Sequence, residues 1–273
     1  PLRLVGSEMC IRDRLYILWT SVAGVAATII IILVLRMMSF SPESDIESIK
    51  VFQADHAPQQ VTLQVAGEEK VEPLKKAVQS LPSSTVKLSP QKIAYNTIQT
   101  ENKKIRNKKV QIHRLSIPRG ETFKVVLSEG TEVFLNSDSR LAYPTVFKGK
   151  ERVVSLEGEA YFKVAKDAAH PFIVKSGNLQ IRVLGTEFNV RSYSPTDVRV
   201  TLITGKVAVS DTCGVHSVEM VPGQSVQLSS DGTFAVNEVD IESFLYWKEG
   251  FFYFDDVALV DMMKEIGRWY NID

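Results

Sequence analysis

The sequence predicts a mainly β protein: an antiparallel all-β domain, sandwich or solenoid-like, with one N-terminal transmembrane helix and a truncated C-terminal βα(β) element. Between residues 117 and 224, apolar residues recur at alternate positions, as in Leu179, Ile181 and Val183, and this period buries one face of a strand. Glycines separate these runs at mostly regular intervals, as turns between antiparallel strands require. No long amphipathic helix alternates with the strands in this stretch, so a parallel α/β sheet is not expected.

Composition narrows the function classes only slightly. The 273 residues have room for one large or two modest domains, and their 32 basic and 32 acidic groups balance. Bulk electrostatics therefore favour neither nucleic acid nor an acidic partner. Cys10 and Cys213 are too few for a disulfide framework. The histidines are isolated from other ligand types, so we predict no metal site and no other cofactor.

Residues 15–38 are predicted to form a transmembrane helix. Leu15 to Leu35 contain no charged side chain, and as a helix they would be about 31 Å long, close to the roughly 30 Å of hydrocarbon in a bilayer. A buried core helix is the alternative, but soluble cores seldom need an unbroken apolar cylinder of this length. A cleaved signal peptide is disfavoured because no small-x-small site follows directly. Arginines precede the span and acidic residues follow it, which places the N-terminus in the cytoplasm.

Residues 1–14 are predicted to be non-native sequence or a cytoplasmic stub. The run from Ser7 to Arg14 is similar to translated sequencing-adapter read-through. The other end of the chain stops where a second strand begins. We therefore expect a fragment of a longer gene product.

The region 39–114 is interpreted as a linker with weak β character. Val61 to Val65 and the runs 86–88 and 92–95 alternate like short strands, and together they faintly repeat the strand–glycine–strand unit at 123–135. A short helix is expected between Val71 and Leu81, with Pro73 tolerated only in its first turn. The basic run 103–109 lacks interleaved aromatic residues, so we interpret it as a solvated linker loop and not as a nucleic-acid patch.

Several phrases of the β-domain occur together in one order. They are Pro-Arg-Gly at 118–120, Leu-x-x-Gly-Thr-x-Val-x-Leu-Asn at 127–136, Leu-Glu-Gly-Glu-Ala-Tyr-Phe at 156–162, Pro-Phe at 171–172, Leu-Gly-Thr-Glu-Phe-Asn-Val at 184–190 and Pro-Gly-Gln at 222–224. With these phrases, residues 115–232 resemble the periplasmic domain of FecR-type anti-sigma factors, as found in Bacteroidetes. The family usually has Asp where this chain has Glu129, and Glu is a poorer turn former, so we expect a slightly different turn there.

The resemblance implies a set of motif residues that are mostly turn and core positions specifying the fold. They are Pro118, Gly120, Gly130, Thr131, Leu135, Asn136, Gly158, Glu159, Ala160, Phe162, Pro171, Phe172, Gly185, Thr186, Phe188, Val190, Gly223 and Trp247.

The resemblance also implies a function and its partners. Such a protein is a single-pass inner-membrane regulator of an extracytoplasmic-function sigma factor, which it binds through a cytoplasmic domain missing here. The signal would come from the signalling domain of a TonB-dependent outer-membrane transporter, by β-augmentation or sheet-edge recognition. Lipid is a further partner, and direct nucleic-acid binding is not expected. The alternative is a membrane-anchored periplasmic β-domain with a structural or carbohydrate-binding role.

Glu157 and Glu159 flank Gly158 and invite comparison with paired catalytic carboxylates. Residues two apart on a strand share a face, so both side chains could point the same way. Gly158, however, marks a turn or bulge, and neither an aromatic sugar platform nor a further acid can be identified nearby. We interpret both as turn or solvent-face acids. No nucleophile elbow or Ser–His–Asp order is found, so no conventional enzyme is predicted.

Gly185-Thr186 is a candidate site of self-cleavage. In some relatives, the threonine hydroxyl of such a pair attacks the preceding carbonyl, and the ester that forms is hydrolysed. Glycine tolerates strained backbone and leaves this carbonyl uncrowded. An ordinary turn glycine followed by a strand threonine is the other interpretation.

The C-terminal region 240–273 is predicted to be a truncated small α/β domain. A strand is expected at Phe251 to Phe254, followed by a helix with apolar residues at 3.6-residue spacing, with Asp255 or Asp256 as its cap. This half unit resembles the small C-terminal domain of the same regulators and the signalling domain of secretins. A lone strand–helix pair cannot bury its own apolar face, so we expect exposed apolar side chains here.

Overall fold

The computed structural model describes residues 60–65, 71–80, 86–89, 91–95, 110–194, 197–229 and 233–272. All of them belong to one compact unit, residues 53–273. The predicted span at 15–38, the segment 1–14 and the basic run 103–109 lie outside the described residues. Within the described part, no helix combines the length and apolar character that membrane crossing requires.

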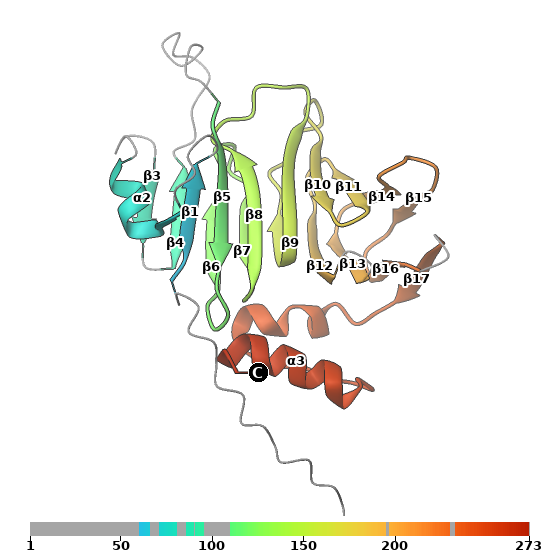
Figure 1. Cartoon of the computed structure of the whole chain (residues 1–273). Coiled ribbons are helices and arrows are strands. Elements are labelled where there is room, and N and C mark those ends of the chain that lie inside the picture. The colour runs from blue at the N-terminus through green and yellow to red at the C-terminus, as the bar shows by residue number, and fades with distance from the viewer. Residues whose placement is uncertain are drawn as a thin grey trace, which may run out of the picture. The chain divides into compact units, whose positions relative to one another are not determined.

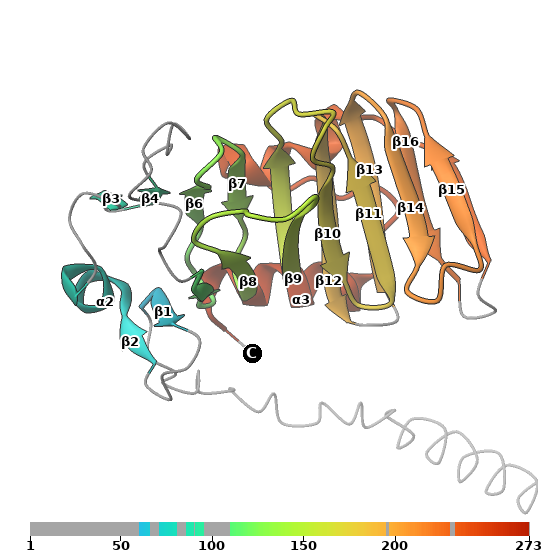
Figure 2. The ribbon, with the colours of Figure 1, turned by 90° about the horizontal axis from the view of Figure 1, so that it is seen from above.

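The described residues form seventeen strands arranged in two layers (Figures 1 and 2). Neighbouring strands pair antiparallel except in the pairs β9–β10 and β4–β6, which are parallel. One layer, sheet A, contains in spatial order β2 (Glu72–Pro73), β1 (Thr62–Val65), β5 (Ile112–Ile117), β8 (Ser139–Pro144), the first half of β9 (Arg152–Lys163), β10 (Phe172–Ser176), β11 (Leu179–Val183), β14 (Val207–Asp211) and β15 (Ser217–Met220).

The other layer, sheet B, is formed by strands that alternate along the chain with those of sheet A, mostly in pairs. It contains β3 (Val86–Ser89), β4 (Lys92–Tyr95), β6 (Phe123–Val126), β7 (Glu132–Leu135), the second half of β9, β12 (Glu187–Ser194), β13 (Asp197–Thr204), β16 (Gln224–Leu228) and β17 (Phe234–Glu238). The predicted mainly β class and its antiparallel character are therefore confirmed.

The core lies between the two sheets and consists of the alternate residues that the sequence pattern singled out. Leu179, Ile181 and Val183 are buried on sheet A, and Phe162 and Phe188 stack on sheet B with their ring centroids 5.1 Å apart. The motif residues Leu135, Ala160, Phe162, Phe172, Phe188 and Val190 are all part of this single hydrophobic cluster.

The strand β9 belongs to both sheets. Its residues 155–157 pair with β8 in sheet A, and its residues 158–163 pair with β12 in sheet B. The change of sheet occurs at Gly158, whose φ of +91° is disfavoured for residues with a side chain. A Cβ at this position would lie 2.4 Å from the Ser139 Oγ and 2.8 Å from the Asp138 carbonyl oxygen. Gly158 therefore allows β8 and β9 to approach closely where the sheets diverge.

The weak β region before residue 114 contributes to the same core as the main domain. The short strands expected there are present as β1, β3 and β4, and they join the larger sheets because β1 pairs with β5 and β4 with β6. Leu63 and Ile93 are fully buried in the common core. The expected helix is α2 (Leu74–Ser80), which begins directly after Pro73.

The C-terminal region differs in part from its prediction. The expected helix is present as α3 (Leu259–Tyr270), preceded by two 3-10 turns, η2 (Glu242–Phe244) and η3 (Tyr246–Glu249). The predicted strand at 251–254 is wrong, because this segment lies against side chains of sheet B and pairs with no strand edge in the described chain. The predicted cap is also wrong: the N-cap is Ala258, without a side-chain hydrogen bond.

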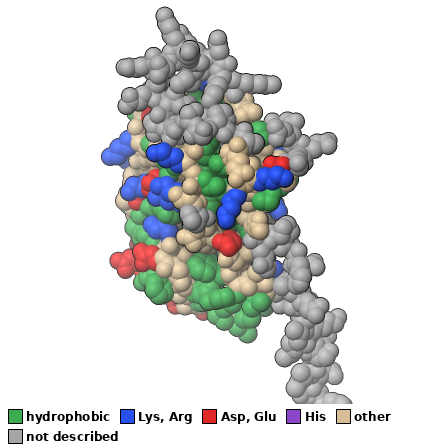
Figure 3. Space-filling view, turned by 90° about the vertical axis from the view of Figure 1, so that its left-hand side faces the viewer, with side chains coloured by type: hydrophobic (Ala, Val, Ile, Leu, Met, Phe, Trp, Pro, Cys, Tyr) green, Lys and Arg blue, Asp and Glu red, His purple; other side chains and the backbone are tan. Residues whose placement is uncertain are grey.

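The end of the molecule that carries α2 has a mixed surface. Figure 3 shows Lys and Arg side chains there in small groups, interspersed with acidic and hydrophobic side chains. Lys75, Lys76 and Lys87 are exposed in this part of the chain. In that view the described residues form no continuous basic field of the kind that binds nucleic acid.

A buried polar cluster joins the two sheets. The Tyr95 hydroxyl on β4 lies 2.6 Å from Nδ1 of His113 on β5 and 2.9 Å from the hydroxyl of Tyr143 on β8. The His113 side chain has no solvent exposure. Burial disfavours its charged form and lowers the pKa of His113 to about 4.

His113 should make the fold sensitive to mild acid. An unfolded histidine protonates near pH 6.5, so between about pH 6.5 and pH 4 the unfolded chain binds a proton that the native state does not. The free energy of unfolding should therefore fall as the pH drops through this window, by up to about 3 kcal/mol from this group.

Urea denaturation of the wild type, His113→Gln and the exposed-site control His216→Gln at pH 7 and pH 4.5 measures this. We expect His113→Gln to lose about 2 kcal/mol less than the wild type between the two pH values, and His216→Gln to follow the wild type. Equal losses in all three proteins would contradict the assignment.

Candidate functional site

A row of buried polar side chains crosses the outer face of sheet B. These side chains point away from the hydrophobic core, yet each is at most 5% exposed. A polar row on an outer face stays buried only if another segment covers it, and here the C-terminal segment, residues 239–272, lies over it. The row consists of Asn136 directly after β7, Glu159 on β9, Asn189 on β12, Thr201 on β13 and Ser225 on β16.

Glu159 is the centre of this row. Asn136 Nδ2 donates to its Oε2 at 3.0 Å, and Asn189 Nδ2 donates to its Oε1 at 2.9 Å. Our interpretation of Glu159 as a turn or solvent-face acid is therefore wrong, whereas the side chain of Glu157 is 74% exposed. The change of sheet at Gly158 places the two acids on different sheets.

Arg191 connects Glu159 to the C-terminal helix. Its Nη1 lies 3.6 Å from Glu159 Oε2 and 2.9 Å from Oε2 of Glu265 on α3. Burial opposes the charge on Arg191, but the carboxylates of Glu159 and Glu265 together raise the pKa of its guanidinium. The three side chains form one charge network that spans the β-domain and α3.

A second set of contacts holds the end of α3. The Arg268 guanidinium lies 3.9 Å from the ring centroid of Tyr193, whose hydroxyl donates to the Ser137 carbonyl at 2.9 Å. The backbone N–H of Gly120 donates to the Arg268 carbonyl at 2.8 Å. Figure 1 shows α3 running below the strands at this end of the sheets. The motif glycine Gly120 therefore binds the C-terminal helix directly.

The 3-10 turn η3 covers the neighbouring part of the face. Trp247 is 8% exposed, and the Lys248 ammonium lies 4.3 Å from the Tyr161 ring centroid and 5.3 Å from that of Phe134. These cation–π contacts fasten the segment over β7 and β9. Trp247 is thus an interface residue, which its position in the sequence did not reveal.

The remaining motif residues occupy turns, as predicted. The Gly130 N–H donates to the Leu127 carbonyl at 3.0 Å, so the turn closes with Glu129 in place of Asp. The Glu129 side chain reaches Arg152, with an oxygen 3.6 Å from Nη1. Thr131 Oγ1 accepts a hydrogen bond from the Ala165 N–H at 3.1 Å. Pro118, Pro171 and Gly223 also lie outside the strands.

Gly185 and Thr186 lie in the turn between β11 and β12. Gly185 has a φ of +155°, and a Cβ there would lie 2.5 Å from Lys166 Cγ. Thr186 is buried, and its hydroxyl donates to the Lys206 carbonyl at 3.0 Å. The hydroxyl that would act as the nucleophile is thus engaged with a different carbonyl group.

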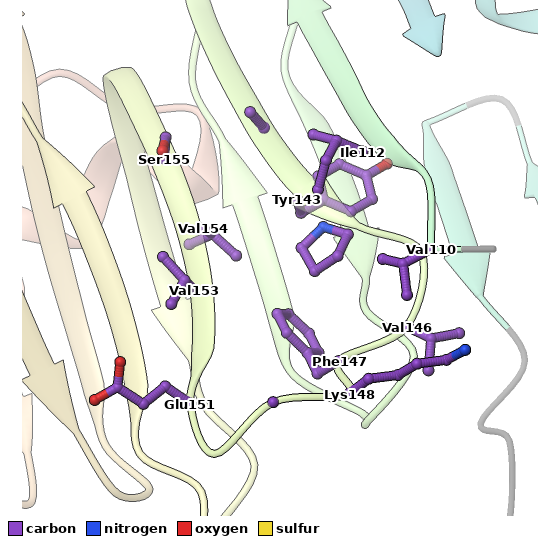
Figure 4. Close-up of a pocket in the computed structure, with 13 residues that line it drawn as sticks. Val110, Ile112, Tyr143, Val146, Phe147, Lys148, Glu151, Val153, Val154 and Ser155 are labelled. Carbon is purple, nitrogen blue, oxygen red and sulfur yellow. The ribbon is translucent and has the colours of Figure 1, made fainter. Parts of the chain in front are cut away.

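Two hollows open on opposite layers of the described structure. On sheet A, an apolar hollow of about 420 Å³ lies where β8 and β9 separate, with Tyr143, Phe147 and Val153 in its lining (Figure 4). None of the motif residues lines it. A cleft of about 890 Å³ lies between sheet B and the C-terminal segment, and it is lined by Glu159 and Trp247. The motif residues therefore point to the cleft on sheet B.

Comparisons with known proteins agree with this fold and these motifs. Residues 113–208 match the family model described as FecR protein. The chain is similar to a protein of Parabacteroides distasonis described as a "putative anti-sigma factor", seen in two crystal structures. Both are 31% identical with a TM-score of 0.55; the matches cover 58% and 59% of this chain and 74% and 75% of those chains. No curated protein matches.

Glu159→Gln should destabilise the protein by about 2 to 4 kcal/mol. A glutamine keeps the shape but leaves an amide donor of Asn136 or Asn189 without an acceptor, and it removes a counter-charge of Arg191. Urea denaturation measures the change. Glu157→Gln is the matched control and should change stability by less than about 0.5 kcal/mol, because its partner Arg140 is solvent-exposed. Similar losses in the two variants would contradict the central role of Glu159.

The Gly185–Thr186 bond should remain intact. The Thr186 hydroxyl donates to Lys206, so it is not directed at the preceding carbonyl. On a denaturing gel, the full chain and its Thr186→Ala variant should give one band of the same size, unchanged by incubation. Two shorter fragments in the wild type that are missing from Thr186→Ala would establish self-cleavage.

Proposed function

The chain belongs to the FecR family of anti-sigma factors, and on that premise we propose that it relays a periplasmic signal across the inner membrane to an extracytoplasmic-function sigma factor. The uncharged stretch Leu15–Leu35 would be the single span, with the N-terminus in the cytoplasm and the β-domain in the periplasm. The sigma factor would bind on the cytoplasmic side.

The signal would come from the signalling domain of a TonB-dependent transporter. The side of α3 that faces away from the sheets supports this proposal, since Leu259, Val260 and Met263 are 66%, 64% and 52% exposed. Exposed apolar side chains clustered on one element are typical of a protein-binding surface. The edge strand β17 offers a second route, by addition of a partner strand to sheet B.

The observation that carries the proposal is the way α3 is held. The polar contacts between α3 and the β-domain include the Arg191–Glu265 ion pair, the stacking of Arg268 on Tyr193 and a backbone hydrogen bond from Gly120. Partly exposed contacts of this kind contribute about 1 kcal/mol each, so a partner that binds α3 can displace them. Docking of α3 would then differ between the signalled and unsignalled states.

The relay can be tested in cells with a promoter reporter for the sigma factor. Glu265→Gln removes the ion pair to Arg191, whereas the matched control Lys264→Gln on the same helix removes only an exposed contact to Asp261. We expect Glu265→Gln to change the reporter output several-fold at a fixed signal, and Lys264→Gln to behave as the wild type. Identical output from all three proteins would argue against a relay through α3.

Partner identity needs a separate measurement. The native gene product should capture a co-expressed extracytoplasmic-function sigma factor in a pull-down, and its reporter should respond to deletion of residues 117–224. Failure to capture any such sigma factor would favour the anchored β-domain with a structural or carbohydrate-binding role.

A further inference from the structure

The cleft on sheet B lies between two parts of the chain, which we call its floor and its roof. The floor is the outer face of β9, β12 and β13, including Glu159, Asn189 and Thr201, and the roof is the C-terminal segment with Trp247. Its volume of about 890 Å³ is within the range of sites that bind drug-sized ligands. The floor residues are fixed by β-sheet pairing, so the site is preorganised.

Two residues of the lining each carry a buried polar atom that has no hydrogen-bond partner among the described residues. These atoms are Oδ1 of Asn189, an acceptor on a side chain that is 2% exposed, and Nε1 of Trp247, a donor on a side chain that is 8% exposed. A buried polar atom without a hydrogen bond costs about 1 to 3 kcal/mol, so a ligand that supplies one donor and one acceptor is favoured. A peptide group supplies both.

The net negative charge of the lining favours a positively charged ligand. Acidic side chains outnumber arginines and lysines around the cleft. Each lining cation already has a partner: Arg191 pairs with Glu159 and Glu265, and Lys264 pairs with Asp261. Arg199 contacts the Gln227 side-chain oxygen, and Arg268 stacks on Tyr193. In contrast, five lining acids have no ion-pair partner within the described part of the chain; they are Asp197, Glu238, Asp240, Asp255 and Asp256.

Exposed aromatic side chains line the same cleft as the free acids. Phe251 and Tyr253 line the cleft and are 62% and 51% exposed, and the sequence continues with Asp255 and Asp256. An aromatic face next to carboxylates suits a guanidinium or an ammonium group, which stacks on the ring and pairs with the acid. A neutral sugar would use the rings but not the free charges.

We propose that this cleft binds an extended segment of a partner protein that carries an arginine or lysine side chain. The peptide backbone pairs with Asn189 and Trp247, and the cationic side chain lies between the aromatic residues and Asp255 or Asp256. This inference deepens the relay proposed above and rests on it for the partner's role, because such a segment would contact the β-domain and the C-terminal segment together.

Binding can be measured by calorimetry with the full chain in detergent. The probe is an acetylated and amidated heptapeptide of glycine and serine with two arginines, and its matched controls carry glutamine or glutamate in their place. We expect saturable binding of the arginine peptide, at least tenfold weaker binding of the glutamine peptide and none of the glutamate peptide. Raising the salt from 50 to 300 mM should weaken the arginine complex several-fold.

Variants locate the site. Asp255→Asn combined with Asp256→Asn changes exposed residues, so the fold should persist while the affinity falls at least fivefold. Glu157→Gln, an exposed acid on sheet A, is the matched control and should bind as the wild type. Trp247→Phe keeps an aromatic ring but removes the donor, and should weaken the glutamine and arginine peptides by similar factors.

Three results would overturn the proposal: no saturable binding of the arginine peptide, equal affinity for the glutamine peptide, or the same affinity in the double aspartate variant. Binding of chitohexaose or maltohexaose in place of the peptides would also overturn it and would indicate a sugar site. Failure of the sigma capture alone would leave these peptide results intact, so the two proposals can fail separately.

Discussion

The change of sheet at Gly158 is the constraint on which the rest of this structure depends. The first half of β9 pairs with β8 and β10, and the second half pairs with β7 and β12, so one strand holds both layers together. Any side chain at residue 158 would push against the backbone of Asp138 and Ser139, and it would separate β8 from β9. Because the strand changes sheet at this glycine, Glu157 lies on the exposed face of sheet A, whereas Glu159 lies on the outer face of sheet B.

Glu159 is buried on the outer face of sheet B because the C-terminal segment shields it from solvent. A buried carboxylate is tolerated only when hydrogen bonds and opposite charges replace its water, and Asn136, Asn189 and Arg191 supply them. Such buried polar groups contribute less to stability than apolar packing of the same volume, but a misplaced partner costs several kcal/mol. These contacts therefore favour one register for the docked C-terminal segment.

The β-domain and the C-terminal segment meet at the outer face of sheet B, and the motif residues Gly120, Asn136, Glu159 and Trp247 lie where they meet. Residues that looked like fold determinants therefore also define an interface. A partner that enters the cleft or covers the apolar side of α3 would act on this interface directly, without any need to deform the core.

The sequence by itself determined the mainly β class, most of the strands, the helix at 259–270 and the family, because alternation, glycine turns and local phrases are properties of neighbouring residues. Tertiary structure alone decided the site. Asn136 and Glu159 are separated by 23 residues and meet through strand pairing, whereas Arg191 and Glu265 are separated by 74 and meet because α3 docks on sheet B. The strand predicted at 251–254 failed for the same reason: its apolar pattern is local, but a strand exists only beside a free sheet edge.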